Sequence, residues 1–327
     1  MAKFNDQTVL ITGGAGYIGS VLCNLALQSG LKVRVVDKLW FNEQIPLIHL
    51  NNPAYTFYRG DIGDRNLMRT ATRGCDYIIH LAAIVGDPAS NLFPDLTQQV
   101  NHEASLQLIS IARENGVKGF VFFSTCSNYG ISDGLATEDS ALNPLSLYAR
   151  TKVDVERHLR DEVKGLDWII GRLSTVYGSS PRMRFDLTVN DFTLNAWKHK
   201  HLKLFLPKSY RPYIHTYDLS NIILQLLSQF EAVRNNVFNI GFEGENYQKI
   251  EIAETIARYV PDLRIEILKE GGDRRDYQVD FSKLHSAISV SQTHDVEASV
   301  KELLQALELG MFSNPGEQRY YNTTPRL

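Results

Sequence analysis

Two segments of the sequence carry side chains that could move a proton. Tyr148 and Lys152 are four residues apart, which places a phenol and an ammonium group on one face of a helix. A phenol has an ordinary pKa of about 10 and is a weak base at neutral pH, but a nearby cation stabilises its ionised form. Thr125 follows the apolar run Phe120 to Ser124, which predicts a hydroxyl group at the end of a buried strand. Ligands bind at the carboxyl ends of parallel strands, so the three side chains predict one catalytic site.

The elements that position these groups alternate along the chain. Short apolar runs without a polar alternation predict strands covered on both faces. Segments with helical spacing of apolar residues lie between them, as in Ile18 to Ser29 and Leu147 to Val163. The predicted strands are Val9 to Thr12, Val33 to Asp37, Tyr55 to Tyr58, Tyr77 to Leu81, Phe120 to Ser124, Trp168 to Leu173 and Asn236 to Ile240. This order predicts an α/β fold with a Rossmann-type, doubly wound parallel sheet.

A glycine-rich turn follows the first predicted strand. Gly13, Gly16 and Gly19 are spaced as a tight turn that opens a helix and lets a pyrophosphate approach the backbone. The second strand ends at Asp37, where a carboxylate would accept hydrogen bonds from both hydroxyls of an adenosine ribose. The same carboxylate would repel a 2′-phosphate, so the sequence predicts NAD rather than NADP.

Two charged residues, Lys38 and Asp61, lie near this predicted site. Lys38 could soften the repulsion between Asp37 and a 2′-phosphate. Asp61, after the third strand, is either an adenine contact or an ordinary turn aspartate, and the sequence leaves both open.

Four motifs together resemble the extended short-chain dehydrogenase/reductase family, which includes UDP-galactose 4-epimerase and dTDP-glucose 4,6-dehydratase. They are TGGAGYIG, HLAA at His80 to Ala83, STCSNYG and YARTK. The resemblance implies that Thr125 orients the substrate, that Tyr148 is the acid/base and that Lys152 binds the cofactor ribose. It also implies further cofactor contacts from Tyr17, Ile18, Ile62, Leu81, Ala82 and Ala83.

The sequence departs from this family's dehydratases after the catalytic threonine. The dehydratases carry Asp-Glu there, whereas this chain has Cys126 and Ser127, so we expect no 4,6-dehydration and a small buried role for Cys126. The segments from Ser180 to Leu187 and from Arg275 to Tyr277 resemble a narrower branch, the GDP-heptose 4-dehydrogenase type. That branch implies redox chemistry at C4 of the sugar.

Several arginines could bind the diphosphate of a nucleotide sugar, because a guanidinium group forms bidentate hydrogen bonds with phosphates. The predicted substrate-binding residues are Arg182, Arg184, Arg211, Arg275 and, as a weaker candidate, Asn190. The resemblance favours Arg211 and Arg275. We interpret His215 as a structural histidine and the pair His199 and His201 as an exposed helix end, and we expect no metal site.

The bulk composition is that of a globular enzyme. The chain has 327 residues and a net charge of -3, without the basic excess of a nucleic-acid-binding protein. Three scattered cysteines predict free thiols, and the absence of a leader or membrane-spanning run predicts a cytoplasmic protein. We assign residues 1–173 and 213–241 to the NAD-binding domain. Residues 174–212 and 242–327 would form the nucleotide-sugar-binding lobe, with 179–213 as an irregular insertion over one edge.

The sequence therefore predicts an NAD-dependent enzyme that oxidises C4 of a nucleotide diphosphate sugar to a 4-keto group. Return of the hydride would make it a 4-epimerase, and release of the ketone a 4-dehydrogenase; the reverse direction would make it a 4-ketoreductase. A dinucleotide sensor without catalysis is the non-enzymatic alternative. By resemblance, we expect a homodimer formed through the helices at Leu96 to Asn115 and Leu147 to Val163, with no membrane or nucleic-acid partner.

Overall fold

A seven-stranded sheet in which all neighbouring strands are parallel forms the centre of the larger part of the molecule. The computed structural model describes residues 2–41 and 44–323. The strand order is β11-β7-β5-β4-β1-β2-β3. The bounds are β1 Thr8–Thr12, β2 Lys32–Asp37, β3 Tyr55–Arg59, β4 Tyr77–His80, β5 Gly119–Thr125, β7 Asp167–Leu173 and β11 Asn236–Ile240. All seven predicted strands are in this sheet, so the predicted fold class is confirmed.

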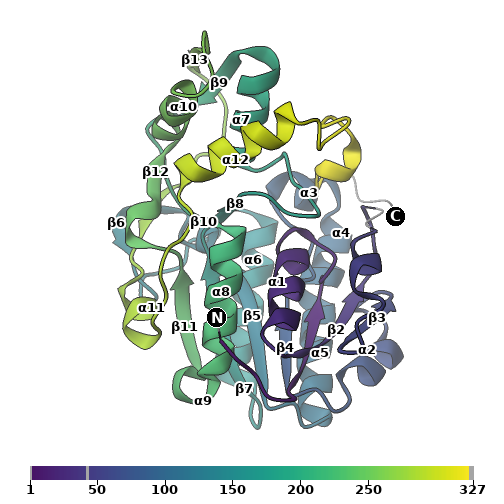
Figure 1. Cartoon of the computed structure of the whole chain (residues 1–327). Helices are drawn as coiled ribbons and strands as arrows, with labels where there is room; N and C mark the ends of the chain where they lie inside the picture. Colours follow the sequence, from purple (N-terminus) through teal and green to yellow (C-terminus); the bar gives the residue numbers. More distant parts are fainter. Residues whose placement is uncertain (1, 42–43, 324–327) are drawn as a thin grey trace.

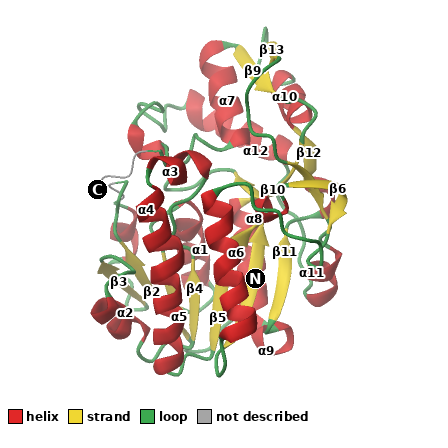
Figure 2. Ribbon diagram, turned by 180° about the vertical axis from the view of Figure 1, so that it is seen from behind, coloured by secondary structure: helices red, strands yellow, loops and turns green. Residues whose placement is uncertain are grey.

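Helices cover both faces of the sheet, and each face has its own apolar core. On one face α1 (Tyr17–Gln28) packs against α8 (Thr216–Ser228). On the other face lie α2 (Arg65–Thr72), α5 (Ala104–Glu114) and α6 (Leu147–Arg157), with α5 and α6 in front in Figure 2. The sequence predicts the homodimer surface on α5 and α6.

A second lobe lies beyond the carboxyl ends of the strands (Figure 1). Its core contains α7 (Thr188–His199), α10 (Lys249–Ala257) and α12 (Val296–Glu308), which contact one another. Three small sheets accompany it, in the orders β12-β10-β8, β13-β9 and β14-β6. Their strands are β6 Ile131–Ala136, β8 Thr175–Tyr177, β9 His201–Phe205, β10 Tyr210–His215, β12 Asn246–Gln248, β13 Arg264–Leu268 and β14 Asp276–Val279.

The prediction of an irregular insertion at residues 179–213 is wrong. This stretch contains the twelve-residue helix α7, the strand β9 and the first residues of β10. The spacing of apolar residues did not predict this helix, because two of its buried positions are polar, Asn190 and Thr193. Both are hydrogen-bonded inside the protein, which lets polar side chains occupy a core face.

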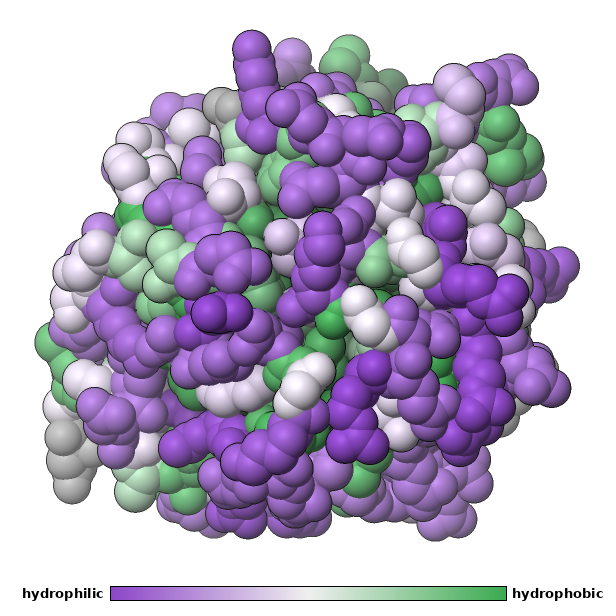
Figure 3. All heavy atoms as spheres, turned by 90° about the horizontal axis from the view of Figure 1, so that it is seen from below, coloured by the Kyte–Doolittle hydropathy of each residue, from purple (hydrophilic) through white to green (hydrophobic). Residues whose placement is uncertain are grey.

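The other α-helices of the described residues are short: α3 Asp87–Leu92, α4 Pro94–Thr97, α9 Phe230–Val233 and α11 Ser282–Ala287. Single turns of 3₁₀ or π helix occur at Ile45–His49, Gln98–Glu103, Cys126–Tyr129, His158–Glu162, Glu243–Glu245 and Gln318–Tyr320. Cys23, Cys75 and Cys126 are buried free thiols, as predicted. Within residues 2–41 and 44–323, no helix combines the length and apolar character that crossing a bilayer requires. Seen from the end opposite the second lobe, the surface is mainly hydrophilic with small separate hydrophobic groups (Figure 3).

Candidate active site

A cavity of about 880 Å³ lies between the carboxyl ends of the strands and the second lobe. Its floor consists of residues that directly follow the strands, including Gly13, Gly60 and Leu81. The lobe contributes Arg184, Arg211 and other side chains to the opposite wall. The topology thus brings the two halves of the predicted site together, as expected for an open parallel sheet.

The glycine turn fits a dinucleotide because its backbone leaves no room for side chains. A Cβ atom on Gly13, which has a φ of +73°, would lie 2.8 Å from the backbone nitrogen of Ala82. A Cβ atom on Gly19 would lie 2.3 Å from the carbonyl oxygen of Gly13. Helix α1 starts directly after Gly16, so its first N–H groups are available to a pyrophosphate.

Asp37 is held at the end of β2 by backbone donors. Its carboxylate accepts hydrogen bonds from the N–H groups of Ala15, at 3.0 Å, and Leu39, at 2.8 Å. Burial raises the pKa of Asp37, and these N–H groups oppose that rise. The nearby Lys38 forms an ion pair with Asp61 at 2.9 Å, so its charge is already balanced. This arrangement supports the predicted contact between Asp37 and the ribose hydroxyls.

The position of Asp61 fits both of its interpretations, and the adenine contact stays a prediction. It lines the cavity, and its Oδ1 accepts a hydrogen bond from the N–H group of Gly63 within a turn. The other predicted cofactor residues, Tyr17, Ile18, Ile62, Leu81, Ala82 and Ala83, also line the cavity.

Trp40 and Phe41 extend the cofactor end of the cavity and were not predicted. The indole Nε1 of Trp40 is buried and has no hydrogen-bond partner among the described residues, which fits a donor that meets a ligand. The guanidinium of Arg182 lies 4.0 Å from the centroid of the Phe41 ring, and its charge acts on Asp37. Arg182 therefore lies near Phe41 and Asp37 and lines the cavity, and its contact with a diphosphate stays a prediction.

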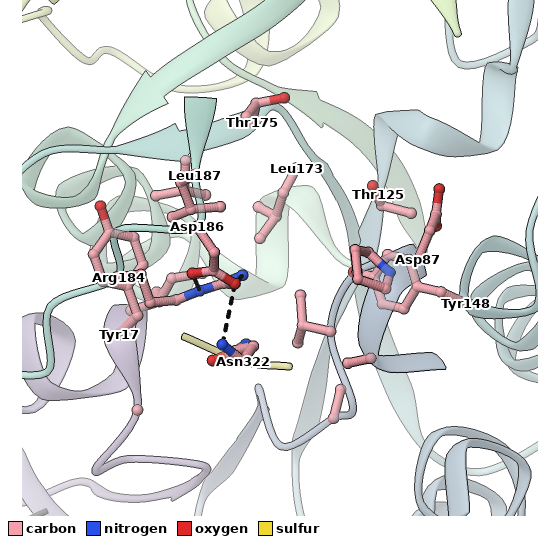
Figure 4. Close-up of a pocket in the computed structure, with 18 of the residues that line it drawn as sticks. Tyr17, Asp87, Thr125, Tyr148, Leu173, Thr175, Arg184, Asp186, Leu187 and Asn322 are labelled. Carbon is pink, nitrogen blue, oxygen red and sulfur yellow. Dashed lines mark hydrogen bonds and ion pairs between the residues drawn. The ribbon is translucent and has the colours of Figure 1, made fainter. Parts of the chain in front are cut away.

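The predicted catalytic side chains meet at the other end of the floor. Thr125 is the last residue of β5, and its hydroxyl accepts a hydrogen bond from the N–H group of Ser127 at 3.1 Å. Ser146 caps α6 through the N–H group of Ala149, which places Tyr148 in the first turn. Lys152 follows one turn later, and all three predicted residues line the cavity. Figure 4 shows two of them, Thr125 and Tyr148.

Burial shifts the pKa values of Tyr148 and Lys152 in the directions that disfavour their charged forms. Burial raises the pKa of Tyr148 to about 12; the charges of Arg184 and Arg275 lower it, and that of Asp87 raises it. Burial also lowers the pKa of Lys152 to about 8, and its ammonium nitrogen lies 4.7 Å from the centroid of the Phe122 ring. Burial therefore opposes ionisation of Tyr148, and the two arginines favour it.

A buried ion pair that the sequence analysis missed anchors the catalytic helix. Arg172 on β7 and Glu156 on α6 are each 1% exposed and approach to 2.8 Å. Arg172 also donates to the hydroxyl of Tyr129 at 2.9 Å, and Tyr129 donates to Asn239 on β11 at 2.6 Å. The only sequence signal was a charged residue within an otherwise apolar strand. Since Glu156 lies one turn after Lys152, this network fixes the helix that carries Tyr148 and Lys152.

Two predicted substrate residues of the lobe are engaged inside the protein. Arg184 forms a bidentate pair with Asp186 at 2.9 and 2.8 Å, and Asp186 also accepts from the N–H group of Asn322 (Figure 4). Asn190 is fully buried, and its amide bonds the N–H group of Gly178, the hydroxyl of Tyr17 and the carbonyl of Arg184. Arg184 lines the cavity, whereas Asn190 lies behind it, so the structure does not place Asn190 as a substrate contact.

Arg211 and Arg275, which the sequence favoured, share one carboxylate. Arg275 contacts Asp273 through Nε at 2.9 Å and Nη2 at 2.5 Å, and Arg211 approaches it at 3.2 Å. These guanidinium groups hold the pKa of Asp273 well below its usual range, although burial opposes this. Lys249 lies near the two arginines, and burial lowers its pKa with a contribution from Arg211. The lobe therefore gathers cations where a diphosphate is expected.

Arg275 also reaches the catalytic end. It donates to the hydroxyl of Ser127 at 2.7 Å and lies 3.3 Å from the carboxylate of Asp87. The hydroxyls of Ser127 and Tyr277 are 3.4 Å apart. The sequence analysis did not single out Asp87 or Tyr277 as site residues. Gly86-Asp87-Pro88 is typical of a turn, and nothing in its spacing connects it to Tyr148.

His215 is a structural histidine, as interpreted, and His199 lies at a helix end, whereas His201 belongs to a strand. His215 accepts a hydrogen bond from the N–H group of Tyr217 and stacks on His294, and burial lowers its pKa to about 3. Its Nε2 has no hydrogen-bond partner among the described residues, so it is satisfied at one nitrogen only. His199 ends α7, but His201 belongs to β9 and pairs with Glu266 at 2.9 Å.

The parallel sheet, the glycine turn with Asp37 and the Thr/Tyr/Lys set define a nucleotide-binding enzyme of the short-chain dehydrogenase/reductase class. The chain belongs to the NAD-dependent epimerase/dehydratase family, whose sequence pattern matches residues 9–241. This assignment confirms the predicted family and the predicted cofactor, NAD.

Related proteins include both epimerases and dehydratases. The chain is 29% identical over 313 residues to a dTDP-glucose 4,6-dehydratase of Streptomyces niveus, covering 86% of this chain and 87% of that protein. It superposes with a TM-score of 0.82 on the UDP-glucose 4-epimerase of Thermotoga maritima in complex with UDP-glucose, at 25% identity and with 93% and 100% of the chains covered. DesIV, a dTDP-glucose 4,6-dehydratase from Streptomyces venezuelae with NAD bound, gives a TM-score of 0.81 at 26% identity, covering 94% and 98%.

Proposed function

We propose that the protein is a nucleotide-sugar 4-epimerase that works through a 4-keto intermediate. The observation that carries this proposal is the meeting of Thr125, Tyr148 and Lys152 in one cavity with Asp37 and the glycine turn. A carboxylate pair at the end of β5 is absent, since Cys126 is buried and Ser127 is a hydroxyl that bonds to Arg275. The relatives include both epimerases and dehydratases and do not distinguish the two reactions. The lack of a carboxylate pair after Thr125 is what favours the epimerase.

In this proposal, the hydroxyl of Thr125 orients the C4 hydroxyl of the sugar, and the phenolate of Tyr148 removes its proton. Bound NAD would supply the acceptor for the C4 hydride and a positive charge at this end of the cavity. Lys152 holds the cofactor ribose and adds a second positive charge, which lowers the pKa of Tyr148 from its value in the free protein. Return of the hydride to the other face of the C4 ketone, with return of the proton from Tyr148, gives the epimer.

The cations of the lobe support a nucleotide diphosphate as the handle of the substrate. Arg211 and Arg275 hold the diphosphate in this proposal, and the sugar extends from it towards Tyr148. Arg275 spans the distance between these regions, because it contacts Asp273 as well as Ser127.

A 4-dehydrogenase, or a 4-ketoreductase in the reverse direction, is the second candidate. The segment from Ser180 to Leu187 resembles the GDP-heptose 4-dehydrogenase type, and it lines the cavity with Arg182, Arg184 and Asp186. In this candidate the 4-keto sugar leaves the cavity before the hydride returns.

Product analysis in deuterated water separates these reactions. The purified protein is incubated with UDP-, GDP- and dTDP-hexoses that carry a free C4 hydroxyl, and the products are followed by NMR and mass spectrometry. We expect a mixture of C4 epimers with no deuterium at C5 and with the C6 oxygen retained. NADH accumulation or dependence on an external hydride acceptor would instead identify the dehydrogenase. A 4-keto-6-deoxy product with deuterium at C6 would refute both.

Tyr148→Phe is the matched control for this experiment, because it removes a single oxygen from the site. Loss of a general base slows turnover by about 10²- to 10⁴-fold, while the fold and NAD binding should persist. Near-normal turnover by this variant would contradict the role of Tyr148. Absence of any turnover by the unmodified protein, with NAD bound, would favour a dinucleotide sensor.

A further inference from the structure

Asp87 places a carboxylate at the catalytic end of the cavity. It is the first residue of the short helix α3, directly after Gly86, which has a φ of +90°. The side chain lies beside Thr125 and Tyr148, across the cavity from Arg184 and Asp186 (Figure 4). It therefore faces the region where the sugar ring would present its reacting carbon.

The two oxygens of Asp87 are in different situations. Oδ2 lies 3.3 Å from Nη2 of Arg275. Oδ1 is buried and has no hydrogen-bond partner among the residues that the structure describes. A buried acceptor without a donor is costly, and in an active site it is commonly completed by a ligand. A sugar hydroxyl is a donor of the right kind, and a carboxylate accepts from it in a charge-assisted hydrogen bond.

The local charge balance disfavours a second carboxylate at this position. Arg275 is the cation next to Asp87, but Asp273 already engages it through Nε and Nη2. A ligand carboxylate brought to this end would lie against the negative charge of Asp87, and the neighbouring guanidinium of Arg275 already pairs with Asp87 and Asp273. Asp87 lies beside Tyr148, and its negative charge adds to the effect of burial in raising the pKa of that phenol.

We infer that Asp87 determines which class of sugar the enzyme accepts. Its Oδ1 accepts a hydrogen bond from a hydroxyl at C6 of the substrate, which selects neutral hexoses and excludes the corresponding uronic acids. The inference rests on the proposed function, because it takes the ligand of this cavity to be a nucleotide sugar presented to Tyr148.

The test compares substrates that differ only at C6. Binding of UDP-glucose and UDP-glucuronate, and of GDP-mannose and GDP-mannuronate, is measured by calorimetry on the NAD-loaded protein. Of these two substrate pairs, the one whose neutral sugar binds with the higher affinity is then used for all variants. We expect the unmodified protein to bind the neutral sugar at least tenfold more tightly than the uronate. Asp87→Asn and Asp87→Ala should reduce that preference at least fivefold, the first mainly by admitting the uronate and the second also by weakening the neutral sugar.

Asp95→Asn is the matched control. Asp95 lies in the first turn of α4, eight residues further on, and it is exposed, so the same change of charge there should leave the preference unaltered. Thermal unfolding of each variant shows whether it is folded. Folded Asp87 variants that keep the full preference for the neutral sugar would overturn the inference, as would equal binding of both sugars by the unmodified protein.

The pH dependence provides a second readout that a purely structural role would not move. Removal of the negative charge of Asp87 lowers the pKa of Tyr148, so the acidic limb of the activity profile of Asp87→Asn should shift to lower pH. An unshifted limb would argue against direct coupling of the two groups. Failure of every nucleotide sugar to bind would refute the proposed function, whereas tight binding without selectivity at C6 refutes the role of Asp87 alone.

Discussion

The two ends of the cavity hold their ligand-binding groups in different ways. At the cofactor end, the backbone forms the binding surface. Gly13 and Gly19 lie against other backbone atoms, and backbone N–H groups hold the Asp37 carboxylate. At the substrate end the groups are side-chain cations already paired with carboxylates, such as Arg184 with Asp186. The cofactor end is thus complete before a ligand arrives. The substrate end must exchange some internal ion pairs for contacts with a diphosphate.

This difference has a physical consequence for specificity. A backbone cradle cannot change without moving strands of the central sheet, so it suits a cofactor that is common to a whole family. Ion pairs on loops of the lobe can be rearranged by single substitutions, which suits substrates that vary between relatives. We therefore expect substitutions of the cradle glycines at the cofactor end to cost fold stability as well as binding, and those at the substrate end to alter binding alone.

The largest effect should come from Gly13→Ala. The new Cβ would lie 2.8 Å from the backbone nitrogen of Ala82, and the residue would have to keep a φ of +73°. A left-handed conformation costs roughly 1–2 kcal/mol and overpacking about 1–3 kcal/mol, so we expect the free energy of unfolding to fall by about 2–5 kcal/mol. NAD binding should be lost as well. Chemical denaturation and NAD titration measure the two effects.

Gly74→Ala separates the two contributions to that loss. Gly74 has nearly the same φ, +71°, but a Cβ there would meet no atom within 4 Å. It should cost only the left-handed conformation, roughly 1–2 kcal/mol, and leave NAD binding intact. Equal losses from the two variants would show that the close approach to Ala82 has no energetic importance.

An intermediate effect is expected from Lys152→Met, which should stabilise the protein without its cofactor. Lys152 is 4% exposed, and burial lowers its pKa from an ordinary 10.5 to about 8. Below pH 8 the ammonium is buried at a cost that methionine avoids, so the free energy of unfolding at pH 7 should rise by on the order of 1–3 kcal/mol. NAD affinity should fall, because the ammonium can no longer reach the ribose.

The pH dependence of this effect has a definite sign. Between about pH 8 and 10.5 the unfolded chain holds a proton on Lys152 that the folded chain has lost, so the stability contributed by this residue increases with pH. The gain from Lys152→Met should therefore be largest below pH 8 and shrink above it. Lys164→Met, at an exposed lysine, should show neither the gain nor its decline with pH. A pH-independent gain would indicate that Lys152 is not the titrating group.

Sequence could predict most of the cofactor end, because its determinants are local. The strands are apolar runs, the turn needs glycine, and Asp37 is the last residue of its strand. The four-residue spacing of Tyr148 and Lys152 likewise follows from helix geometry. These elements are set by backbone chemistry over a few residues, so a linear pattern carries enough information to locate them.

The substrate end could be predicted only in part, because its arrangement depends on contacts between distant segments. Arg184 and Arg275 were found as residue types, but their carboxylate partners were not. Asp87 and Arg275 are in contact although they are 188 residues apart in the sequence. Asp87 belongs to α3, and Arg275 lies in the loop before β14. Arg182 was grouped with Arg211 by residue type, yet the fold carries it to Phe41. Long-range packing decides these pairings, and a single sequence does not record it.

The smallest effect should come from Asp273→Asn, which tests whether the substrate end is adaptable. Asp273 holds both Arg211 and Arg275, and its carboxylate competes with a diphosphate for them. Its side chain is 38% exposed, and exposed ion pairs contribute about 0.2–1 kcal/mol, so the affinity for UDP or GDP should rise only about two- to fivefold.

Because its pKa is held well below the usual range, Asp273 remains ionised from pH 5 to 8, and the gain from Asp273→Asn should be constant over that interval. Calorimetric titration of UDP and GDP measures it. Glu270→Gln removes one negative charge three residues earlier, at an exposed position in the same loop, and should change affinity less. Weaker binding by Asp273→Asn would mean that the carboxylate positions the arginines for the diphosphate. The substrate end would then be as fully preformed as the cofactor end, and the contrast between them would fail.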